Sequence, residues 1–117
     1  MSARFAHLHL HSEYSLADST IRIGELVKRC AMLRQPAVAL TDINNLFAAV
    51  KFYKACEGAG IKPILGADIG LADGNETPSR MTLLCRDRAG YLTLSRLLTR
   101  MWMEGHRTDG VAMRPEW

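Results

Sequence analysis

The chain lacks any apolar run long enough to cross a bilayer, because charged residues interrupt every candidate before the ~20 residues that a membrane helix needs. The first residues, Met-Ser-Ala-Arg-Phe-Ala-His, contain neither the apolar core nor the cleavage site of a secretory signal. Intrinsic disorder is also excluded, since 48% of the residues are hydrophobic. We therefore expect one globular unit that makes no contact with a membrane.

Cysteine is scarce as well. Cys30, Cys56 and Cys85 are an odd number, and neither a zinc-ligand spacing nor a CxxC redox motif is present. Such cysteines are typical of reduced thiols, so we expect a cytoplasmic protein. The net charge is +3, and residues 80–117 hold seven arginines against four acidic residues. This basic segment suits a nucleic-acid neighbour, although a solvated helix face explains it more simply.

The apolar pattern predicts an α/β protein. Alternation and short apolar runs favour strands, whereas spacings of three and four residues favour helices. The expected order is β-α-β-α-β-β-α, which is typical of a mostly parallel sheet or barrel. The strands are expected at residues 5–11, 37–41, 62–71 and 81–85, and the helices at 23–33, from 46 to Gly58 or Gly60, and from 91 to Gly105.

The second of these helices carries two more detailed predictions. Leu46, Ala49, Val50 and Tyr53 form the apolar stripe that we expect to face the core. Asp42 stands just before the helix, where a carboxylate is typical of an N-cap. The tail at 106–117 shows no regular pattern.

Histidine is also rare, but its placement is unusual. Three of the four histidines occupy positions 7, 9 and 11. On a strand, alternate side chains lie on one face about 6.6–7 Å apart. Imidazoles at that separation can converge on one metal ion through their ring nitrogens. Hydrogen-bonded core histidines are the alternative, which is favoured for His7 and stays open for His9 and His11.

Carboxylates could complete such a site. In α/β folds the catalytic and binding residues lie at the carboxyl ends of strands. His9, His11, Asp42 and Asp68 all lie at or near such ends. Asp18 and Asp68 are the candidate oxygen ligands. Each of these two also suits a loop cap or a surface position. Cys85 ends an apolar strand and is interpreted as a core residue.

Three segments together carry a specific resemblance. His7-Leu-His-Leu-His11-Ser-Glu-Tyr-Ser15-Leu-Ala-Asp18 resembles the first motif of the polymerase and histidinol phosphatase (PHP) domain. Thr41-Asp-Ile-Asn-Asn45-Leu-Phe resembles its second motif, which often reads Thr-Asp-His-Gly-Asn. The segment from Lys51 to Asp68 resembles the branch of the family that forms the N-terminus of bacterial DNA polymerase III α subunits.

The resemblance implies a distorted (β/α)7 barrel more than twice as long as this chain. Residues 1–117 would then be the N-terminal half of a PHP domain, and the rest of the barrel and the polymerase domains would lie outside the chain. Family members with a full metal site hydrolyse phosphoesters, and some polymerase-attached members act as proofreading 3′–5′ exonucleases. In other polymerases the site has decayed, and the domain helps to hold a separate proofreading exonuclease subunit.

The family's ligand positions can be followed residue by residue. His9, His11, Asp18 and Asp68 match the histidine pair and two acidic ligands of the family. However, Ile43 and Arg80 stand where further histidines are expected, and neither side chain can coordinate a cation. The resemblance therefore implies a vestigial site that binds at most one Zn²⁺ or Mn²⁺ ion weakly.

The expected function is that of the N-terminal segment of a DNA-directed DNA polymerase, a nucleotidyltransferase whose Mg²⁺ ions bind in another domain. The segment alone is expected to be inactive. The implied partners are the rest of the α subunit, a proofreading exonuclease subunit, and DNA through the parent chain. The isolated segment is also expected to self-associate through uncovered strand edges. The alternatives are a metal-dependent PHP phosphoesterase or 3′–5′ exonuclease, and an unrelated barrel metallohydrolase.

Overall fold

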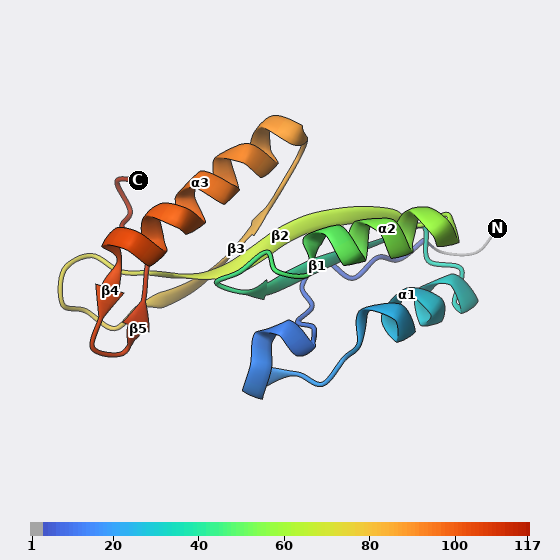
Figure 1. The fold of residues 1–117 in the computed structure, drawn as a ribbon, viewed down its shortest axis with the longest axis horizontal. Helices are drawn as coiled ribbons and strands as arrows, with labels where there is room; N and C mark the ends of the chain where they lie inside the picture. Colours follow the sequence, from blue (N-terminus) through green and yellow to red (C-terminus); the bar gives the residue numbers. More distant parts are fainter. Residues whose placement is uncertain (1–3) are drawn as a thin grey trace.

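The computed structural model describes residues 4–117, with the backbone alone at Ala17 (Figure 1). It confirms the α/β class and six of the seven expected elements. The elements, in chain order, are the 3₁₀ turn η1 (Glu13–Asp18), α1 (Ile23–Met32), β1 (Ala37–Ile43), α2 (Ala49–Ala59), β2 (Lys62–Leu71), β3 (Ser79–Leu84), α3 (Arg88–Glu104), β4 (His106–Arg107) and β5 (Gly110–Val111).

The main sheet has the order β1-β2-β3. β1 runs parallel to β2, which is the arrangement that the helical crossover α2 requires, and β3 runs antiparallel to β2. Gly66 lies where β2 and β3 approach most closely, because a Cβ atom there would lie 2.4 Å from the carbonyl oxygen of Leu83. The register places Asp68 between Ile43 and Thr82. These three side chains therefore lie on one face of the sheet.

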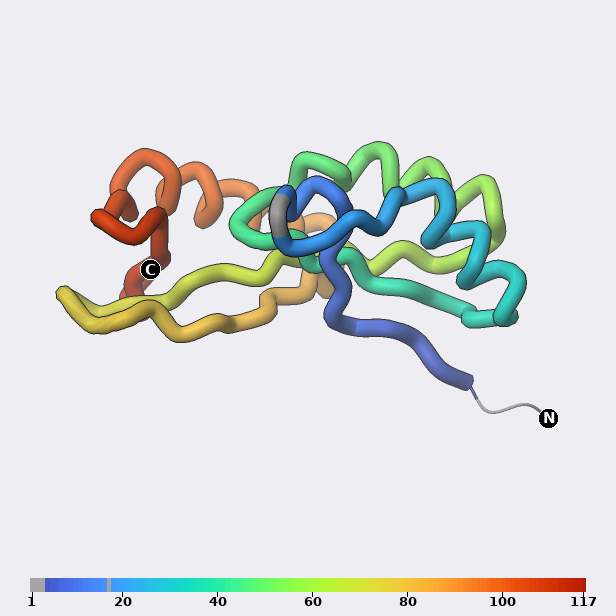
Figure 2. The backbone as a smooth tube through the Cα atoms, turned by 90° about the horizontal axis from the view of Figure 1, so that it is seen from below, coloured from blue at the N-terminus to red at the C-terminus, as the bar shows by residue number. Residues whose placement is uncertain are grey.

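The three helices pack on one side of this sheet (Figure 2), and the N-terminal segment runs along the edge of β1, to which backbone hydrogen bonds join it. Two apolar clusters fill the helical side. The cluster between α1, α2 and the sheet consists of Ile23, Val27, Cys30, Val38, Leu40, Ala48, Phe52, Cys56 and Ile61. The cluster beneath α3 consists of Ala67, Ile69, Leu94, Leu98, Met101 and Met113, with Cys85 packed against it as expected.

The expected strand at residues 5–11 is wrong as a regular element. The segment follows β1 in extended form, but the two backbone hydrogen bonds fall at His7, whose oxygen accepts from Ala39 N–H, and at Leu10, whose oxygen accepts from Thr41 N–H. Three residues of the segment therefore match two of β1, and the chain bends at Leu8 and His9. In addition, the side chain of Thr41 accepts a hydrogen bond from Leu10 N–H, which replaces a regular ladder contact.

The expected stripe of α2 is half right, and the expected cap is wrong. Ala49 is buried and Leu46 packs against the cluster beneath α3, but Val50 and Tyr53 are 65% and 50% exposed. Phe52 and Cys56 are buried in their place, because they face α1 and the sheet. The N-cap of α2 is Ala48, and Asp42 instead lies buried within β1.

Gly105 ends α3 as expected, but the helix begins at Arg88, three residues before the expected start. Asp87 caps its first turn by accepting a hydrogen bond from Gly90 N–H. The tail adds a short hairpin, β4-β5, which the sequence pattern did not reveal. None of the helices in residues 4–117 combines the length and the apolar character that a membrane crossing requires.

Candidate metal centre

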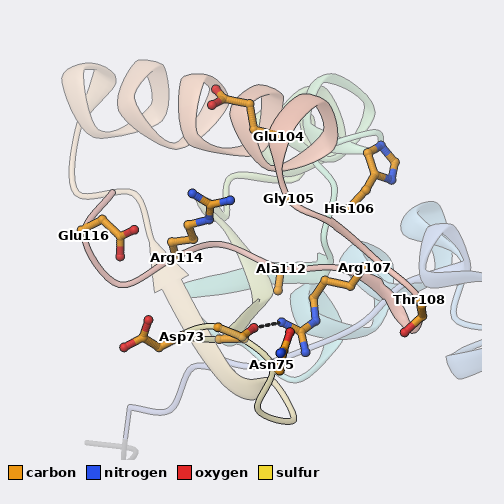
Figure 3. A pocket seen from close by; sticks show the side chains of 12 residues that line it. Asp73, Asn75, Glu104, Gly105, His106, Arg107, Thr108, Ala112, Arg114 and Glu116 are labelled. Carbon is orange, nitrogen blue, oxygen red and sulfur yellow. Dashed lines mark hydrogen bonds between the residues drawn. The ribbon is translucent and has the colours of Figure 1, made fainter.

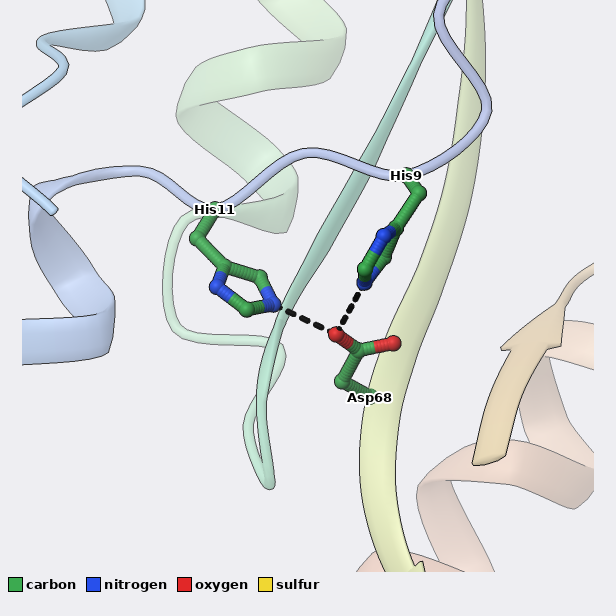
Figure 4. Close-up of side chains that lie close together, drawn as sticks. All are labelled: His9, His11 and Asp68. Carbon is green, nitrogen blue, oxygen red and sulfur yellow. Dashed lines mark hydrogen bonds and ion pairs between the residues drawn. The ribbon is translucent and has the colours of Figure 1, made fainter. Parts of the chain in front are cut away.

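Asp68 is the central residue of the candidate site. It lies on β2, and its side chain is 1% exposed. A buried carboxylate needs hydrogen-bond donors, because its charge has lost contact with water. Nε2 of His9 and Nε2 of His11 each lie 2.5 Å from Oδ2 of Asp68 (Figure 4). The hydroxyl of Thr82 donates to the other oxygen, Oδ1, and so orients the carboxylate.

The two histidines reach Asp68 from the bent N-terminal segment. Their rings lie edge to face with centroids 5.3 Å apart, and their side chains are 62% exposed for His9 and 17% exposed for His11. Spacing by two residues thus places both imidazoles on the same side, as the sequence predicts, although the segment is not a regular strand. His7 lies outside this group, where its ring contacts that of Phe5 edge-on.

Asp18, the remaining candidate ligand, contacts the other side of His11. Its carboxylate hydrogen-bonds to Nδ1 of His11, whereas Asp68 contacts Nε2 of the same ring. Asp18 therefore orients the imidazole from behind. The three donor atoms that lie within 4.8 Å of one another in the described chain are those of His9, His11 and Asp68.

The contacts of this cluster set its protonation. Burial lowers the pKa of His11, but the hydrogen bonds that its ring donates to Asp68 and Asp18 outweigh this effect and hold the pKa above the usual 6.5. Burial raises the pKa of Asp68, but hydrogen bonds from Thr82, His11 and His9 outweigh it and hold the pKa below the usual 3.8. The contacts thus favour the charged form of both groups, the carboxylate of Asp68 and the protonated imidazole of His11.

Ile43 and Arg80, the two departures from the family pattern, lie on the face of the sheet that carries Asp68. Ile43 is the neighbour of Asp68 on β1, so a histidine at that position would stand beside the carboxylate. Arg80 lies two residues from Thr82 on β3 and is exposed. Strand alternation places the side chains of Arg80 and Thr82 on the same face.

The sequence analysis places Asp42 near a strand end but assigns it to a helix cap, whereas the structure shows a second buried carboxylate. Asp42 accepts hydrogen bonds from the backbone and hydroxyl of Ser12 and from the hydroxyl of Ser15. These contacts attach the start of η1 to the end of β1. The serines that follow the histidine motif were the available signal, but serine is common in loops for many reasons.

The donor set suits one divalent ion. Two imidazoles and one carboxylate are a ligand combination of catalytic zinc sites, which leave a further position open. Ligand atoms on one tetrahedral ion with bonds of ~2.0–2.1 Å lie about 3.3 Å apart. The hydrogen-bonded nitrogen and oxygen atoms of the cluster lie 2.5 Å apart, so an ion would replace these hydrogen bonds.

A wide hollow of about 760 Å³ lies elsewhere, beside the β4-β5 hairpin (Figure 3). It is lined by acidic and basic side chains, including Glu104 and Arg114. The guanidinium of Arg107 in its wall donates to the carbonyls of Gly74 and Glu76 and so anchors the neighbouring loop. The hollow shares no lining residue with the histidine cluster.

Two solved structures have folds similar to that of this chain. An amidohydrolase from Chromobacterium violaceum aligns with a TM-score of 0.63 and 23% identity, over 82% of this chain and 32% of the other. A protein assigned as a metal-dependent phosphoesterase from Bifidobacterium adolescentis aligns with a TM-score of 0.66 and 20% identity, over 89% and 35%. At this level of identity the likeness shows the fold.

Sequence relatives are much more similar. The chain is 53% identical to a DNA polymerase III subunit alpha of Xylella fastidiosa, over 99% of this chain and 11% of the relative. It is 46% identical to that of Pseudomonas aeruginosa, over 100% and 10%, and 40% identical to that of Escherichia coli K12, over 97% and 10%. The chain thus spans about a tenth of these curated relatives. The PHP domain family model matches residues 7–117, and the chain belongs to this family.

Proposed function

We propose that residues 1–117 form the N-terminal part of the PHP domain of a bacterial replicative DNA polymerase α subunit. The identity of 46–53% over almost the whole chain is the observation that carries this proposal. The parent chain would act as a DNA-directed DNA polymerase in the cytoplasm, with Mg²⁺ bound in another domain. The segment itself would supply architecture and contacts to the rest of the subunit and to a proofreading exonuclease subunit. DNA would be bound through the parent chain.

In this setting the histidine cluster would act as a metal centre with fewer ligands than the full site of the family. His9, His11 and Asp68 would hold one Zn²⁺ or Mn²⁺ ion weakly, and Asp18 would support it through His11. When bound, the ion would supply a Lewis acid. Three donors favour weak binding, because closed structural zinc sites use four. Ile43 beside Asp68 leaves the fourth position without a ligand.

The proposal is tested by combining His9→Ala and His11→Ala in the full-length chain. We expect this variant to lose the weak Zn²⁺ binding that wild type shows in a titration, because both imidazole donors are gone. Primer extension and co-purification with the exonuclease subunit should stay within about twofold of wild type, since the segment takes no part in nucleotidyl transfer. Zn²⁺ titration and primer extension are measured on the same preparations. A wild-type chain without primer-extension activity would contradict the proposal.

A metal-dependent phosphoesterase is the second candidate. The convergence of His9, His11 and Asp68 favours it, because this donor set can activate a water molecule. Phosphoester or single-stranded DNA hydrolysis that is sensitive to a chelator, and absent from the double histidine variant, would establish this activity. The alternative of an unrelated barrel hydrolase is disfavoured, because the chain belongs to the PHP family.

The affinity of the site for Zn²⁺ is expected to rise with pH. Both ring nitrogens of His11 contact carboxylates, and the pKa of its imidazole is raised above 6.5. A metal ion needs the deprotonated Nε2 and must displace this proton. Affinity should therefore fall about tenfold for each pH unit below the raised pKa. Zn²⁺ titrations at about pH 6, 7 and 8 measure the slope.

The stability of the metal-free fold should fall between about pH 6 and 8, whereas the affinity for Zn²⁺ should rise. The contribution of charged His11 is complete below its unfolded pKa of ~6.5 and is lost as pH rises through its raised folded pKa. The contribution of Asp68 is present above its unfolded pKa of ~3.9 and is lost as pH falls through its lowered folded pKa. Thermal unfolding with a chelator present measures this. Stability and metal affinity that rise together between about pH 6 and 8 would contradict the assignment.

Self-association of the isolated segment stays a prediction. Within the described residues β3 pairs with β2 alone, so its other edge is available for pairing.

A further inference from the structure

Asp42 is a buried carboxylate that lies outside the candidate metal centre and contacts the stretch directly after His11. The residue is 2% exposed, and its carboxylate lies at the end of β1. Oδ1 accepts from Ser12 N–H at 2.6 Å and from the hydroxyl of Ser15 at 2.8 Å, and Oδ2 accepts from the hydroxyl of Ser12 at 2.7 Å. Ser12 itself is fully buried. All of these donors come from a four-residue stretch that directly follows His11.

The stretch held by Asp42 has little regular structure of its own. It opens η1, a 3₁₀ turn that is interrupted at Leu16, where φ is 53° and the backbone is not helical. A non-glycine residue in this region is sterically disfavoured, so external contacts must hold the turn in place. The hydroxyl of Ser15 also accepts from Ile43 N–H at 3.0 Å, which ties the same turn to β1 a second time.

The turn in question determines how His11 is held. Ser12, the N-cap of η1, follows His11 directly, and the N–H of the peptide bond between them donates to Asp42. The last residue of η1, Asp18, hydrogen-bonds to Nδ1 of His11. The hydroxyl of Ser19 donates to the carbonyl of His11 and closes the loop. A shift of the turn would therefore move both the backbone of His11 and the carboxylate that orients its ring.

We propose that Asp42 is a positioning residue for the metal centre, acting on His11 through Ser12, Ser15 and the η1 turn. This inference rests on the proposed metal site. In the described part of the chain, the hydrogen bonds of the Asp42 carboxylate end on Ser12 and Ser15 and not on a member of the histidine cluster. Its effect is thus indirect, and it should be seen in the placement of His11 even when no ion is bound.

The test uses Asp42→Asn in the full-length chain, because asparagine keeps the shape but turns one acceptor into a donor that faces the serine donors. The first readout needs no metal. Modification of His11 by diethylpyrocarbonate, followed by peptide mass spectrometry, should be slow in wild type, where the side chain is 17% exposed. We expect Asp42→Asn to raise this rate at least threefold, and His9, already exposed, to change little.

The second readout is Zn²⁺ affinity, with the double histidine variant as the baseline. We expect Asp42→Asn to weaken binding by about 10–100-fold, as for other residues that orient metal ligands. Asp87→Ala is the control for lost stability, because Asp87 caps α3 away from the site and alanine removes the acceptor of that cap. Ser15→Ala removes one of the contacts and should give a smaller effect of the same kind if Asp42→Asn does not fold.

Three outcomes decide the matter. Faster His11 modification with weaker Zn²⁺ binding supports the proposal. A lower unfolding temperature with His11 modification at the wild-type rate overturns it, because Asp42 would then only stabilise the fold. If wild type binds no Zn²⁺, the proposed metal site fails, while the modification rates still show whether Asp42 positions His11.

Discussion

Replacing Asp68 with asparagine is expected to weaken Zn²⁺ binding by more than ~100-fold, which corresponds to about 2.7 kcal/mol. The carboxylate is the point on which both Nε2 atoms converge, and its side chain is 1% exposed. A neutral amide removes the negative charge that offsets the ion, and burial prevents water from replacing it. Isothermal titration with Zn²⁺ and with Mn²⁺ measures the loss, after circular dichroism has shown that the variant is folded.

Asp18→Asn is the matched comparison for this variant. Asp18 is also an aspartate at a predicted ligand position, but its side chain is 49% exposed and contacts Nδ1 of His11. Loss of an orienting partner should weaken binding by about tenfold. If the two variants lose the same affinity, Asp18 coordinates the ion directly, as the sequence suggests, and its assignment as an orienting residue is wrong.

Replacing Phe52 with alanine is expected to cost about 3–5 kcal/mol of unfolding free energy. The ring is fully buried and is the largest member of the cluster between α1, α2 and the sheet. Since domains of this size are stable by only about 5–15 kcal/mol, this loss leaves the isolated chain close to unfolding. Urea denaturation followed by far-UV circular dichroism measures the change.

Val50→Ala distinguishes the two apolar stripes of α2. The sequence pattern places Val50 in the core, whereas the structure leaves it 65% exposed. We therefore expect this substitution to change the unfolding free energy by no more than about 0.5 kcal/mol. A loss comparable to that of Phe52→Ala would mean that the helix is rotated and that the sequence-based stripe was correct.

Local pattern was sufficient for most of the elements. Helix α1 is recognisable because its apolar residues recur every three or four positions and Pro36 follows its end. Strands β1 and β2 are recognisable as short apolar runs. The bend at Leu8 and His9 was not, because it depends on pairing with β1 and on the side chain of Thr41, which lies 31 residues from Leu10.

The sequence by itself determined the family and the α/β class, and it named His9, His11, Asp18 and Asp68 as candidate ligands. These inferences depend on residue type and on patterns along the chain. The tertiary structure selected the three of these side chains whose donor atoms lie close together, those of His9, His11 and Asp68. Only the tertiary structure decided which nitrogen of His11 each carboxylate contacts, and that Asp42 supports the η1 turn instead of capping a helix. The reason is physical. A carboxylate can serve as a helix N-cap, as a metal ligand or as a buried hydrogen-bond acceptor, and the sequence alone does not distinguish these roles. The hydrogen-bond donors that the fold places within reach of the carboxylate determine which role it takes.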